Sequence, residues 1–334
     1  SLHDALPILC KIFGYLKYME RNVMKKIPLI ILTGPTAVGK TDLSIKLAKD
    51  MNAEIISADS MQIYEYMDIG SAKVTEEEMQ GVKHYLIDEV KPDYPFSVSE
   101  FQQRAKKYIH EINKKEKCVL VTGGTGLYLN SLIYNMDFAQ SDANNELREE
   151  LQKQLAEKGI DYMHNKLKEL DEESANRIHK NNTKRVIRAL EVCLSGKKMN
   201  DFSSDLKFNE EYQPIIIVLN RDREHLYQRI NMRVDIMIKN GLVEEVKKLL
   251  SMGFKKDMIS MQGIGYKEIL KYLDGEYTYE EAIEIIKRDS RRYAKRQITW
   301  FKRYKTAKWF DLDQYENIDE LKNEIILYIK DSIK

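Results

Sequence analysis

A glycine-rich loop between an apolar run and an amphipathic segment constrains this chain more than any other feature. The loop is GPTAVGKT, Gly34 to Thr41, with Ile27 to Leu32 before it and Asp42 to Asp50 after it. The pattern G-x-x-x-x-G-K-[ST] between a strand and a helix is typical of a phosphate-binding loop, whose backbone N–H groups converge on phosphate oxygens. In such a loop Lys40 adds a positive charge and the Thr41 hydroxyl can hold Mg²⁺. The sequence therefore predicts a ligand that carries a di- or triphosphate.

The order of apolar and amphipathic segments predicts the fold class, which is α/β. We expect a P-loop NTPase-like parallel sheet flanked by helices, with an inserted all-helical subdomain. After the first strand, buried strands are expected at 53–57, 118–121 and 215–219, the last of which completes the sheet. Residues 24–136 and 206–334 are accordingly assigned to the catalytic core with its C-terminal helices, and residues 137–205 to the insertion.

Helical spacing of apolar residues predicts the helices of both parts. In the insertion we expect helices at 146–158, 162–170 and 183–195. In the core we expect them at 99–114, 223–240, 243–252 and 266–273, the first of these capped by Ser97 or Ser99. A last long helix is expected to begin at the capping box Thr278–Glu281 and to run towards Lys305.

Composition indicates the cellular location of the protein better than it indicates the partners. Lys+Arg 54 against Asp+Glu 53 leaves a formal net charge of +1, so the overall charge favours no partner. Cys10, Cys118 and Cys193 are isolated, which argues against a zinc site or a disulfide framework and favours a cytoplasmic location. No apolar run approaches the roughly 18 residues that span a membrane. Residues 1–23 are expected to be an extraneous or appended N-terminal segment, because Met24 stands directly before the first strand.

The acid that a hydrolytic P-loop enzyme needs is not found at its usual place. Such enzymes add a strand that ends in a metal-holding Asp, whereas here the strand 118–121 runs into Thr122-Gly123-Gly124. The acid at a strand end is instead Asp59, which can act as a general base. The competing interpretation is a carboxylate that positions Mg²⁺ or caps a helix. The loop is thus expected to hold a phosphate that leaves.

Two basic clusters indicate nucleic acid. Residues 287–308 carry ten Lys or Arg with a single acid, interleaved with Tyr293, Trp300, Phe301 and Tyr304. A solvated basic face with its aromatic residues in the core explains this pattern as well. A second cluster, in the insertion, favours the nucleic-acid interpretation; its members are Lys180, Lys184, Arg185 and Arg188.

An ordered series of segments resembles the tRNA dimethylallyltransferases, also called isopentenyl-diphosphate:tRNA transferases. The segments are GPTAVGKT at 34–41, DSMQIYEYMDIGSAK at 59–73, GGTGLYLNSL at 123–132, KRVIRALEV at 184–192, QGIGYKE at 262–268 and RRYAKRQITWFKR at 291–303. The resemblance covers nearly everything from Met24 onward. Because the Cys/His zinc finger of the eukaryotic relatives is missing from the sequence, the chain resembles the bacterial type.

The resemblance implies an activity and its partners. The family transfers a dimethylallyl group from dimethylallyl diphosphate, with Mg²⁺ as cofactor, to the exocyclic amine of the adenosine 3′-adjacent to the anticodon, and releases diphosphate. It implies binding to the tRNA anticodon stem-loop, and we expect a monomer without a membrane partner. The insertion, 137–205, is then the tRNA-binding subdomain.

The resemblance also implies roles for individual residues. The catalytic residues are Asp59, Lys40, Thr41, Arg229 and Arg233, with Thr41 as the metal ligand. The donor diphosphate is expected on Gly34, Pro35, Thr36, Ala37, Val38, Gly39, Lys40 and Thr41. Contacts to tRNA are expected from Asp59, Ser60, Met61, Gln62, Thr125, Lys184, Arg185, Val186, Ile187, Arg188, Gly263, Ile264, Gly265, Tyr266, Lys267 and Glu268.

Two other functions fit parts of the pattern. A P-loop phosphotransferase, that is a nucleotide or small-metabolite kinase with Asp59 as its base, predicts ATP binding but leaves the segment QITWFKR unexplained. An RNA-binding protein with a nucleotide-gated P-loop would need an Asp-bearing guanine-reading motif, which Asn182-Thr183-Lys184-Arg185 lacks.

Overall fold

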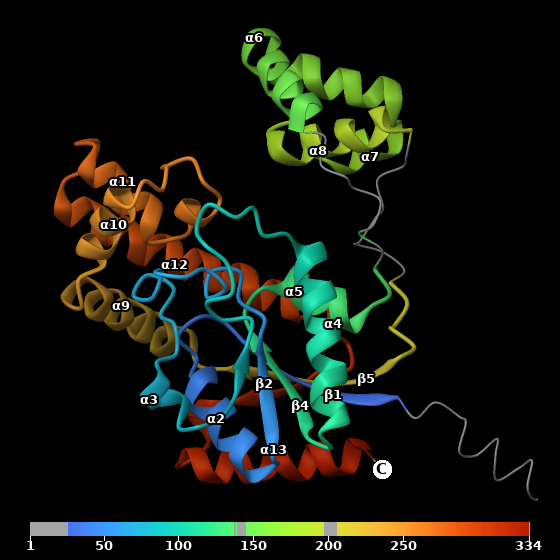
Figure 1. The fold of residues 1–334 in the computed structure, drawn as a ribbon, viewed down its shortest axis with the longest axis vertical. Coiled ribbons are helices and arrows are strands. Elements are labelled where there is room, and N and C mark those ends of the chain that lie inside the picture. The colour runs from blue at the N-terminus through green and yellow to red at the C-terminus, as the bar shows by residue number, and fades with distance from the viewer. Residues whose placement is uncertain (1–25, 137, 139–144, 197–205, 334) are drawn as a thin grey trace, which may run out of the picture. The chain divides into compact units, whose positions relative to one another are not determined.

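A parallel sheet forms the centre of the structure, a computed structural model that describes residues 26–136, 138, 145–196 and 206–333 (Figure 1). Within these residues six strands pair in the order β3-β2-β4-β1-β5-β6. All neighbouring pairs are parallel. The strands are β1 (Ile27–Thr33), β2 (Ala53–Ser57), β3 (His84–Tyr85), β4 (Cys118–Gly123), β5 (Tyr212–Asn220) and β6 (Lys308–Asp311). The predicted fold class, a P-loop-type parallel sheet flanked by helices, is confirmed.

Both faces of the sheet are buried, which explains why its strands read as continuous apolar runs. Successive side chains of a strand point to opposite faces. In β1, Leu29 and Ile31 therefore enter one apolar core, while Ile30 and Leu32 enter the other. Each core is completed by helices on its own face of the sheet.

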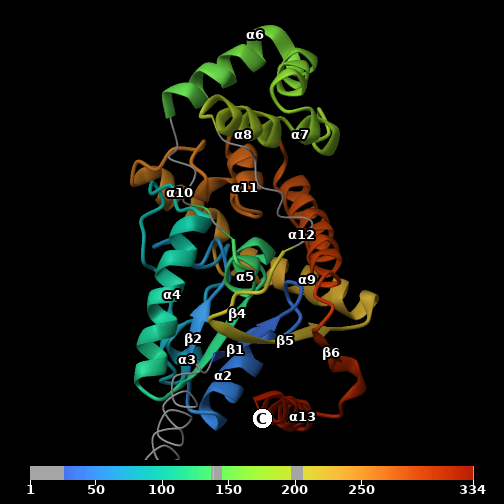
Figure 2. The ribbon, with the colours of Figure 1, turned by 90° about the vertical axis from the view of Figure 1, so that its right-hand side faces the viewer.

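Helices α2 (Lys40–Asp50) and α13 (Ile318–Ile333) pack side by side on one face (Figure 2). The other face is covered by α4 (Val98–Lys114) and α5 (Gly126–Ile133). The remaining helices of the core are α3 (Glu76–Met79), α9 (Arg223–Lys239), α10 (Leu242–Ser251), α11 (Tyr266–Leu273) and α12 (Tyr279–Phe301), with short 3-10 turns η1 (Ser260–Gln262) and η2 (Leu312–Gln314). Thr278 caps α12 in a capping box, as the sequence predicted, and Ser97, one of the two predicted candidates, caps α4 in another capping box.

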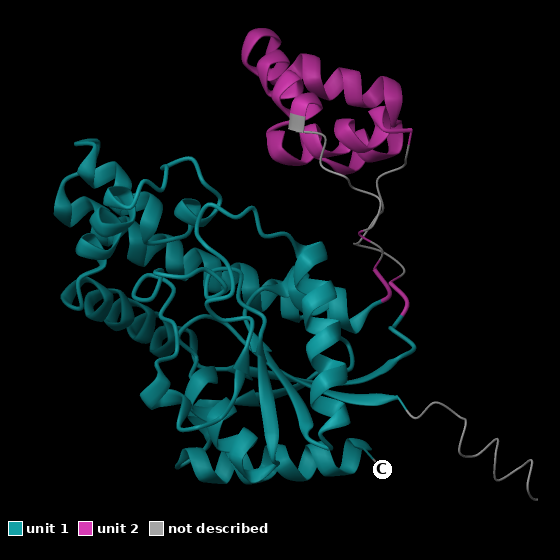
Figure 3. Cartoon of the chain, viewed as in Figure 1, with its two compact units in different colours: residues 1–134, 208–334 teal, residues 135–207 magenta. Residues whose placement is uncertain are grey.

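The chain divides into two compact units (Figure 3). The second unit comprises residues 135–207, and the first unit the rest, whereas the sequence placed the insertion at 137–205. The second unit contains α6 (Asn145–Leu170), α7 (Glu172–Arg177) and α8 (Thr183–Leu194). Gly159 interrupts α6 with a non-helical backbone, at the position where the sequence predicted a break between two helices.

The segments that enter and leave the insertion are paired. Tyr134 and Phe208 form an antiparallel bridge. Next to it, the Asn209 N–H donates to the Ile133 carbonyl at 2.9 Å, and the Asn135 N–H donates to the Lys207 carbonyl at 2.8 Å. The insertion thus leaves and rejoins the core at one place.

Two expectations about the C-terminal part are wrong. Strand β5 does not complete the sheet, because β6 pairs alongside it, with Val218 opposite Trp309. Helix α12 ends at Phe301 and does not run towards Lys305. It ends there because the chain turns to bury Tyr304, whose hydroxyl donates to Asn130 Oδ1 at 2.6 Å.

Residues 1–23, predicted to be an appended segment, lie outside the described residues. Of the helices in the described ranges, none has the length and apolar character to cross a membrane.

A buried carboxylate stabilises the sheet near the amino-terminal ends of its strands, opposite the end that carries the P-loop. Glu54 on β2 is 4% exposed and accepts hydrogen bonds from Lys115 and Lys117, each at 2.9 Å, and from the Tyr85 hydroxyl at 2.6 Å. Although burial alone would raise the pKa of this carboxyl, these donors lower it from 4.5 to about 2. The carboxylate is thus held in its charged form by the folded chain.

We expect Glu54→Gln to lower the free energy of unfolding by about 3–4 kcal/mol at pH 7, from about 1.4 kcal/mol per pKa unit. Because the folded-state pKa is depressed, this contribution is complete above the ordinary pKa and disappears as the pH falls from about 4.5 to 2. Urea denaturation of both proteins across this range measures it, with the partly exposed Glu111→Gln as control. A difference between wild type and Glu54→Gln that does not narrow at low pH would contradict the prediction.

Candidate active site

The site lies where the carboxyl ends of four neighbouring strands meet. β1 leads into the P-loop, β2 into Asp59, β4 into the turn Gly123–Thr125, and β5 into Arg221. In a parallel sheet all these ends lie at the same edge, which is where open α/β folds bind ligands. The structure therefore brings the P-loop and Asp59 together, as the sequence predicted.

Two glycines allow the P-loop to bend and pack closely. Gly39 has a φ of 114° at the start of α2, a conformation that favours glycine. A Cβ on Gly34 would lie 2.6 Å from the Leu219 carbonyl oxygen of β5, so the loop packs directly on the neighbouring strand. The first backbone N–H groups of α2 have no partner within the helix and face an anion-binding position. Val38 is fully buried, and its N–H donates to the Pro35 carbonyl at 3.4 Å.

Lys40 lies among other cations. Its ammonium donates to the carbonyls of Gly34 and Pro35, at 2.9 and 2.8 Å. Burial and the nearby guanidinium of Arg233 lower its pKa to about 7, although Asp59 acts in the opposite direction. Burial, together with Arg229, likewise lowers the pKa of Arg233. A polyanion would relieve the repulsion among these groups.

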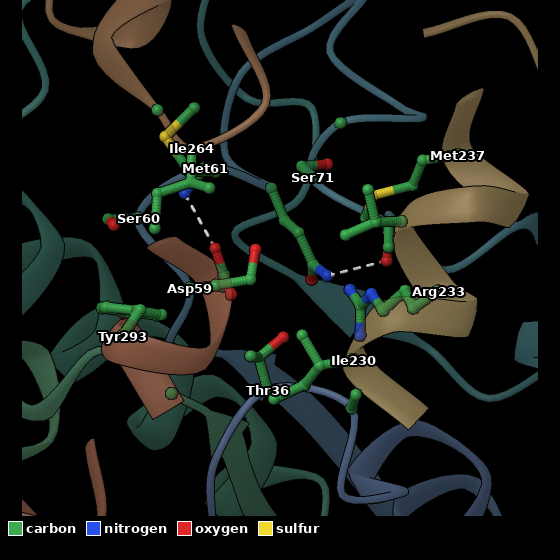
Figure 4. Close-up of a pocket in the computed structure, with 18 of the residues that line it drawn as sticks. Thr36, Asp59, Ser60, Met61, Ser71, Ile230, Arg233, Met237, Ile264 and Tyr293 are labelled. Carbon is green, nitrogen blue, oxygen red and sulfur yellow. Dashed lines mark hydrogen bonds between the residues drawn. The ribbon is translucent and has the colours of Figure 1, made fainter. Parts of the chain in front are cut away.

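The two arginines of α9 occupy different places. Arg233 borders the cavity with Asp59 and Thr36 (Figure 4). Arg229 is exposed, and its Nε donates to the Ala37 carbonyl at 2.9 Å. Arg221, which the sequence analysis did not single out, donates in the same way to the Val38 carbonyl at 3.1 Å. Arg229 and Arg221 thus hold the backbone of the P-loop, and Arg229 also lines the cavity, as Arg233 does.

The loop after β2 carries Asp59 to Gln62, all of which line the same cavity. The Met61 N–H donates to Asp59 Oδ1 at 2.9 Å, which fixes the carboxylate at the start of the loop. Thr125 joins this group from the β4 side, because its hydroxyl accepts the Ser60 N–H at 3.1 Å. The predicted neighbours Asp59, Ser60 and Thr125 are therefore assembled.

A cavity of about 820 Å³ joins these polar groups to an apolar wall (Figure 4). Thr36, Lys40, Asp59 and Arg233 line its polar part. The apolar part is formed by side chains from several elements of the core: Met61, Tyr64, Phe96, Tyr128, Ile230, Met237, Ile264 and Ile286. Such a cavity suits a ligand with an anionic head and a short hydrocarbon.

Thr41 lines a second, smaller cavity of about 50 Å³ together with Ser57, Asp59 and Thr122. Hydroxyl and carboxylate oxygens are ligands that suit Mg²⁺, which proteins hold with one or two carboxylates and the phosphates of the substrate. In the described ranges, no three or more His, Cys, Asp or Glu side chains are grouped so that they could hold a metal ion. The donor set thus fits a metal bound jointly with a phosphate ligand.

Residues of α12 complete the site, and sequence reasoning missed them. Gln297 is 5% exposed; its Oε1 accepts the Thr36 N–H at 2.9 Å and its Nε2 donates to the Gly124 carbonyl at 3.0 Å. Tyr293 lines the large cavity, and burial raises the pKa of its hydroxyl to about 12. Both belong to the segment 291–303, which we had interpreted through its positive charges. Their spacing of four residues, which places them on one helix face, was the available signal.

The segment 262–268 meets the cavity only in part. Gly263 and Ile264 line it. The side chain of Tyr266 is fully buried, and its hydroxyl donates to Glu245 Oε1 at 2.7 Å. Glu268 is 2% exposed, and its Oε2 accepts the Gly265 N–H at 2.8 Å as a helix cap. Both side chains thus serve the packing of α11, and the contact of Tyr266 and Glu268 with tRNA stays a prediction.

The residues of α8 for which tRNA contacts were predicted differ in the exposure of their side chains. Val186 and Ile187 belong to the apolar core of the helical unit, so their side chains do not face solvent. Arg188 is bound to the buried Glu191 at 2.8 Å, and Arg148 binds the same carboxylate at 2.9 Å. Lys184 and Arg185 are exposed. Of this segment, only these two present charged ends that the helical unit leaves to solvent.

Some aromatic residues of the basic segment 287–308 fit the alternative interpretation, in which the aromatic side chains lie in the core. Phe301 and Tyr304 are buried in the core. The basic side chains of Arg292, Lys295 and Arg296 are exposed along α12. The segment is thus a basic helix face with an apolar face packed inward.

Comparison with known proteins identifies relatives along most of the chain. Residues 62–304 match the family described as IPP transferase. The chain is 58% identical to the tRNA dimethylallyltransferase of Alkaliphilus oremlandii, over 89% of this chain and 95% of that protein. It is 54% identical to the enzyme of the same name from a Thermoanaerobacter species, over 91% and 98% of the two chains.

Solved structures of similar fold belong to enzymes with related names. The full-length tRNA isopentenylpyrophosphate transferase of Bacillus halodurans is 44% identical, with a TM-score of 0.68 over 92% of this chain and 98% of that one. A eukaryotic dimethylallyltransferase acting on tRNA is 28% identical, with a TM-score of 0.75 over 90% and 80% of the two chains.

We expect an anion bound at the P-loop to raise the pKa of Lys40 from about 7, because a nearby negative charge favours the ammonium form. Binding of inorganic diphosphate at pH 8 should therefore take up a fraction of a proton at Lys40. Calorimetry in two buffers of different ionisation enthalpy measures this uptake. Lys40→Gln corrects for the protonation of diphosphate itself, and equal proton uptake by both proteins would rule out a titrating Lys40.

Proposed function

The chain belongs to the IPP transferase family, and we infer that it transfers a dimethylallyl group from dimethylallyl diphosphate to the exocyclic amine of the adenosine 3′-adjacent to the anticodon in tRNA. Diphosphate is released. The observation that carries this function is the single cavity that joins the P-loop, Asp59 and an apolar wall. The apolar wall beside the phosphate-binding loop suits the hydrocarbon of an allylic diphosphate, and the relatives are named as dimethylallyltransferases.

We place the diphosphate of the donor on the P-loop, with the five-carbon chain against the apolar wall. During transfer the bond between the allylic carbon and the diphosphate oxygen breaks, and negative charge grows on the leaving group. The N–H groups at the start of α2, the ammonium of Lys40 and the guanidinium of Arg233 are fixed donors for this charge. Arg229 lines the same cavity and in addition holds the Ala37 carbonyl of the P-loop.

We assign Asp59 as the general base. As the bond between the amine nitrogen and the allylic carbon forms, the nitrogen loses a proton, and the Asp59 carboxylate accepts it. The Met61 N–H holds Oδ1 in place, so the carboxylate is oriented before the substrate arrives. The apolar wall excludes water, which would otherwise attack the allylic carbon.

The hydroxyl of Thr41 is the proposed ligand for Mg²⁺, with Asp59 and Ser57 beside the same small cavity. When bound, the metal would stabilise the negative charge of the diphosphate. The side chains at this cavity do not form a complete set of ligands, so the affinity for Mg²⁺ is expected to depend on the donor.

tRNA is the acceptor, and we propose that the enzyme grips its anticodon stem-loop. The adenosine must leave the base stack to reach a buried electrophile, at a cost of a few kcal/mol. Contacts to the phosphate backbone offset this cost. The exposed cations of α12 and of α8 are suited to make them. Each chain carries a P-loop, Asp59 and the cavity, so we expect a monomer to suffice, in the cytoplasm where tRNA is modified.

Incubation of the protein with tRNA and labelled dimethylallyl diphosphate, and in parallel with labelled ATP, tests the function. We expect the prenyl label, and no phosphate label, to appear in tRNA. Phosphoryl transfer from ATP without prenyl transfer would favour the kinase alternative.

Asp59→Asn should lower the rate of prenyl transfer by about 10²-fold or more, the usual scale for the loss of a general base. Donor binding should stay close to that of the wild type, because the P-loop is unchanged. Single-turnover transfer and equilibrium binding of the donor measure the two effects, with the exposed Asp93→Asn as the matched control. Near-normal turnover by Asp59→Asn would remove Asp59 from the mechanism.

Lys184→Ala combined with Arg185→Ala should weaken tRNA binding and flatten its salt dependence. Each lost phosphate contact lowers the slope of log K against log salt by about 0.9 or less. Arg188→Ala is the contrasting variant: it breaks the ion pair with Glu191 and should lower the melting temperature of the helical unit. tRNA affinity at several salt concentrations and thermal unfolding separate these effects. An unchanged slope for the double variant would place the tRNA elsewhere.

A further inference from the structure

We propose that Gln297 is a positioning residue that sets the spacing between the donor loop and the loop that carries Asp59. The proposal rests on the function proposed above. The two loops come from different strands, and transfer requires the amine and the allylic carbon to meet at bonding geometry. A displacement of about 1 Å in such an arrangement costs about 10²-fold in rate.

The amide of Gln297 contacts both sides of the site. On the donor side, its Oε1 accepts the N–H of Thr36, inside the P-loop. On the other side, its Nε2 donates to the carbonyl of Gly124, in the turn after β4. Each contact is made to backbone, so the amide fixes the two chain segments themselves rather than one side chain.

From Gly124 the connection continues to Asp59. The next residue, Thr125, accepts the N–H of Ser60 at 3.1 Å. The Thr125 N–H itself donates to the carbonyl of Ala58 at 3.2 Å. Residues on both sides of Asp59 are thus held by the turn that Gln297 holds, so a shift of Gln297 is transmitted to the general base.

The glycine at 124 is required by this contact. A Cβ on Gly124 would lie 2.3 Å from Gln297 Nε2, closer than real contacts allow. Gly124 is not among the glycines with a positive φ, so its backbone accommodates alanine. Gly124→Ala therefore displaces the amide of Gln297 without straining the turn.

Only a group that both donates and accepts can make the two contacts. The carboxylate introduced by Gln297→Glu accepts from Thr36 but repels the Gly124 carbonyl, whereas its protonated form reproduces both hydrogen bonds. Burial raises the pKa of such a carboxyl. The activity of this variant, relative to wild type, should therefore increase as the pH falls.

We expect Gln297→Glu to lower kcat at pH 8 by about tenfold or more, with the donor KM changed less than threefold, because the start of α2 still binds the diphosphate. The ratio of its kcat to that of wild type should rise between pH 8 and pH 6. A ratio that stays flat with pH, or a kcat within twofold of wild type at pH 8, overturns the proposal. Gln102→Glu is the control, because Gln102 is a buried glutamine of α4 that donates to the Ser131 carbonyl at 2.8 Å.

A double-mutant cycle gives a second test that does not depend on the introduced carboxyl. Gly124→Ala should lower kcat about tenfold in the wild-type background and less than twofold in the Gln297→Ala background, where no amide is displaced. Equal losses in both backgrounds overturn the proposal. The wild type, measured in the same assay, distinguishes failure of the proposed function from failure of the proposed role of Gln297. If the wild type transfers the prenyl group while these variants behave like wild type, only the role of Gln297 fails.

Discussion

Parallel pairing of β1 with β4 on one side and β5 on the other is the constraint on which the site depends. It fixes the carboxyl ends of the strands at one edge and sends both faces of every strand into a core. The backbone of the P-loop then packs directly against β5 at Leu219, which leaves no room for a side chain at Gly34. The phosphate-binding loop and Asp59, which are 18 to 25 positions apart in the sequence, become neighbours because their strands are held in register through β4.

The same features explain which parts of the fold and of the site could be predicted from the sequence. The P-loop and Asp59 follow local patterns that announce a strand end, and the sequence located them. The short strand β6 has only four residues among charged neighbours, so no periodicity marks it. The basic pattern of α12 continues past Phe301, whereas the helix ends there because Tyr304 is buried, which only tertiary packing decides. The contact of Gln297 with Thr36 spans 261 positions, a relation that no local pattern encodes.

The charges of the site serve its ligand rather than the stability of the fold. Burial and Arg233 lower the pKa of Lys40, burial and Arg229 lower the pKa of Arg233, and Asp59 opposes both shifts. Locally unfavourable arrangements of this kind are typical of functional sites. Arg221 and Arg229 donate hydrogen bonds to carbonyls of the P-loop, and these bonds stabilise the conformation of the loop against this repulsion. A bound polyanion converts the repulsion into attraction.

The paired segments at Tyr134 and Phe208 bear on how the chain folds. Closing a loop costs conformational entropy that grows with its length, and the whole insertion lies between β4 and β5 in the sequence. Once the helical unit has formed, however, Asn135 and Lys207 are hydrogen-bonded, so the effective loop between the two halves of the sheet is short. The insertion therefore adds residues between β4 and β5 without separating the two points at which it leaves and rejoins the core.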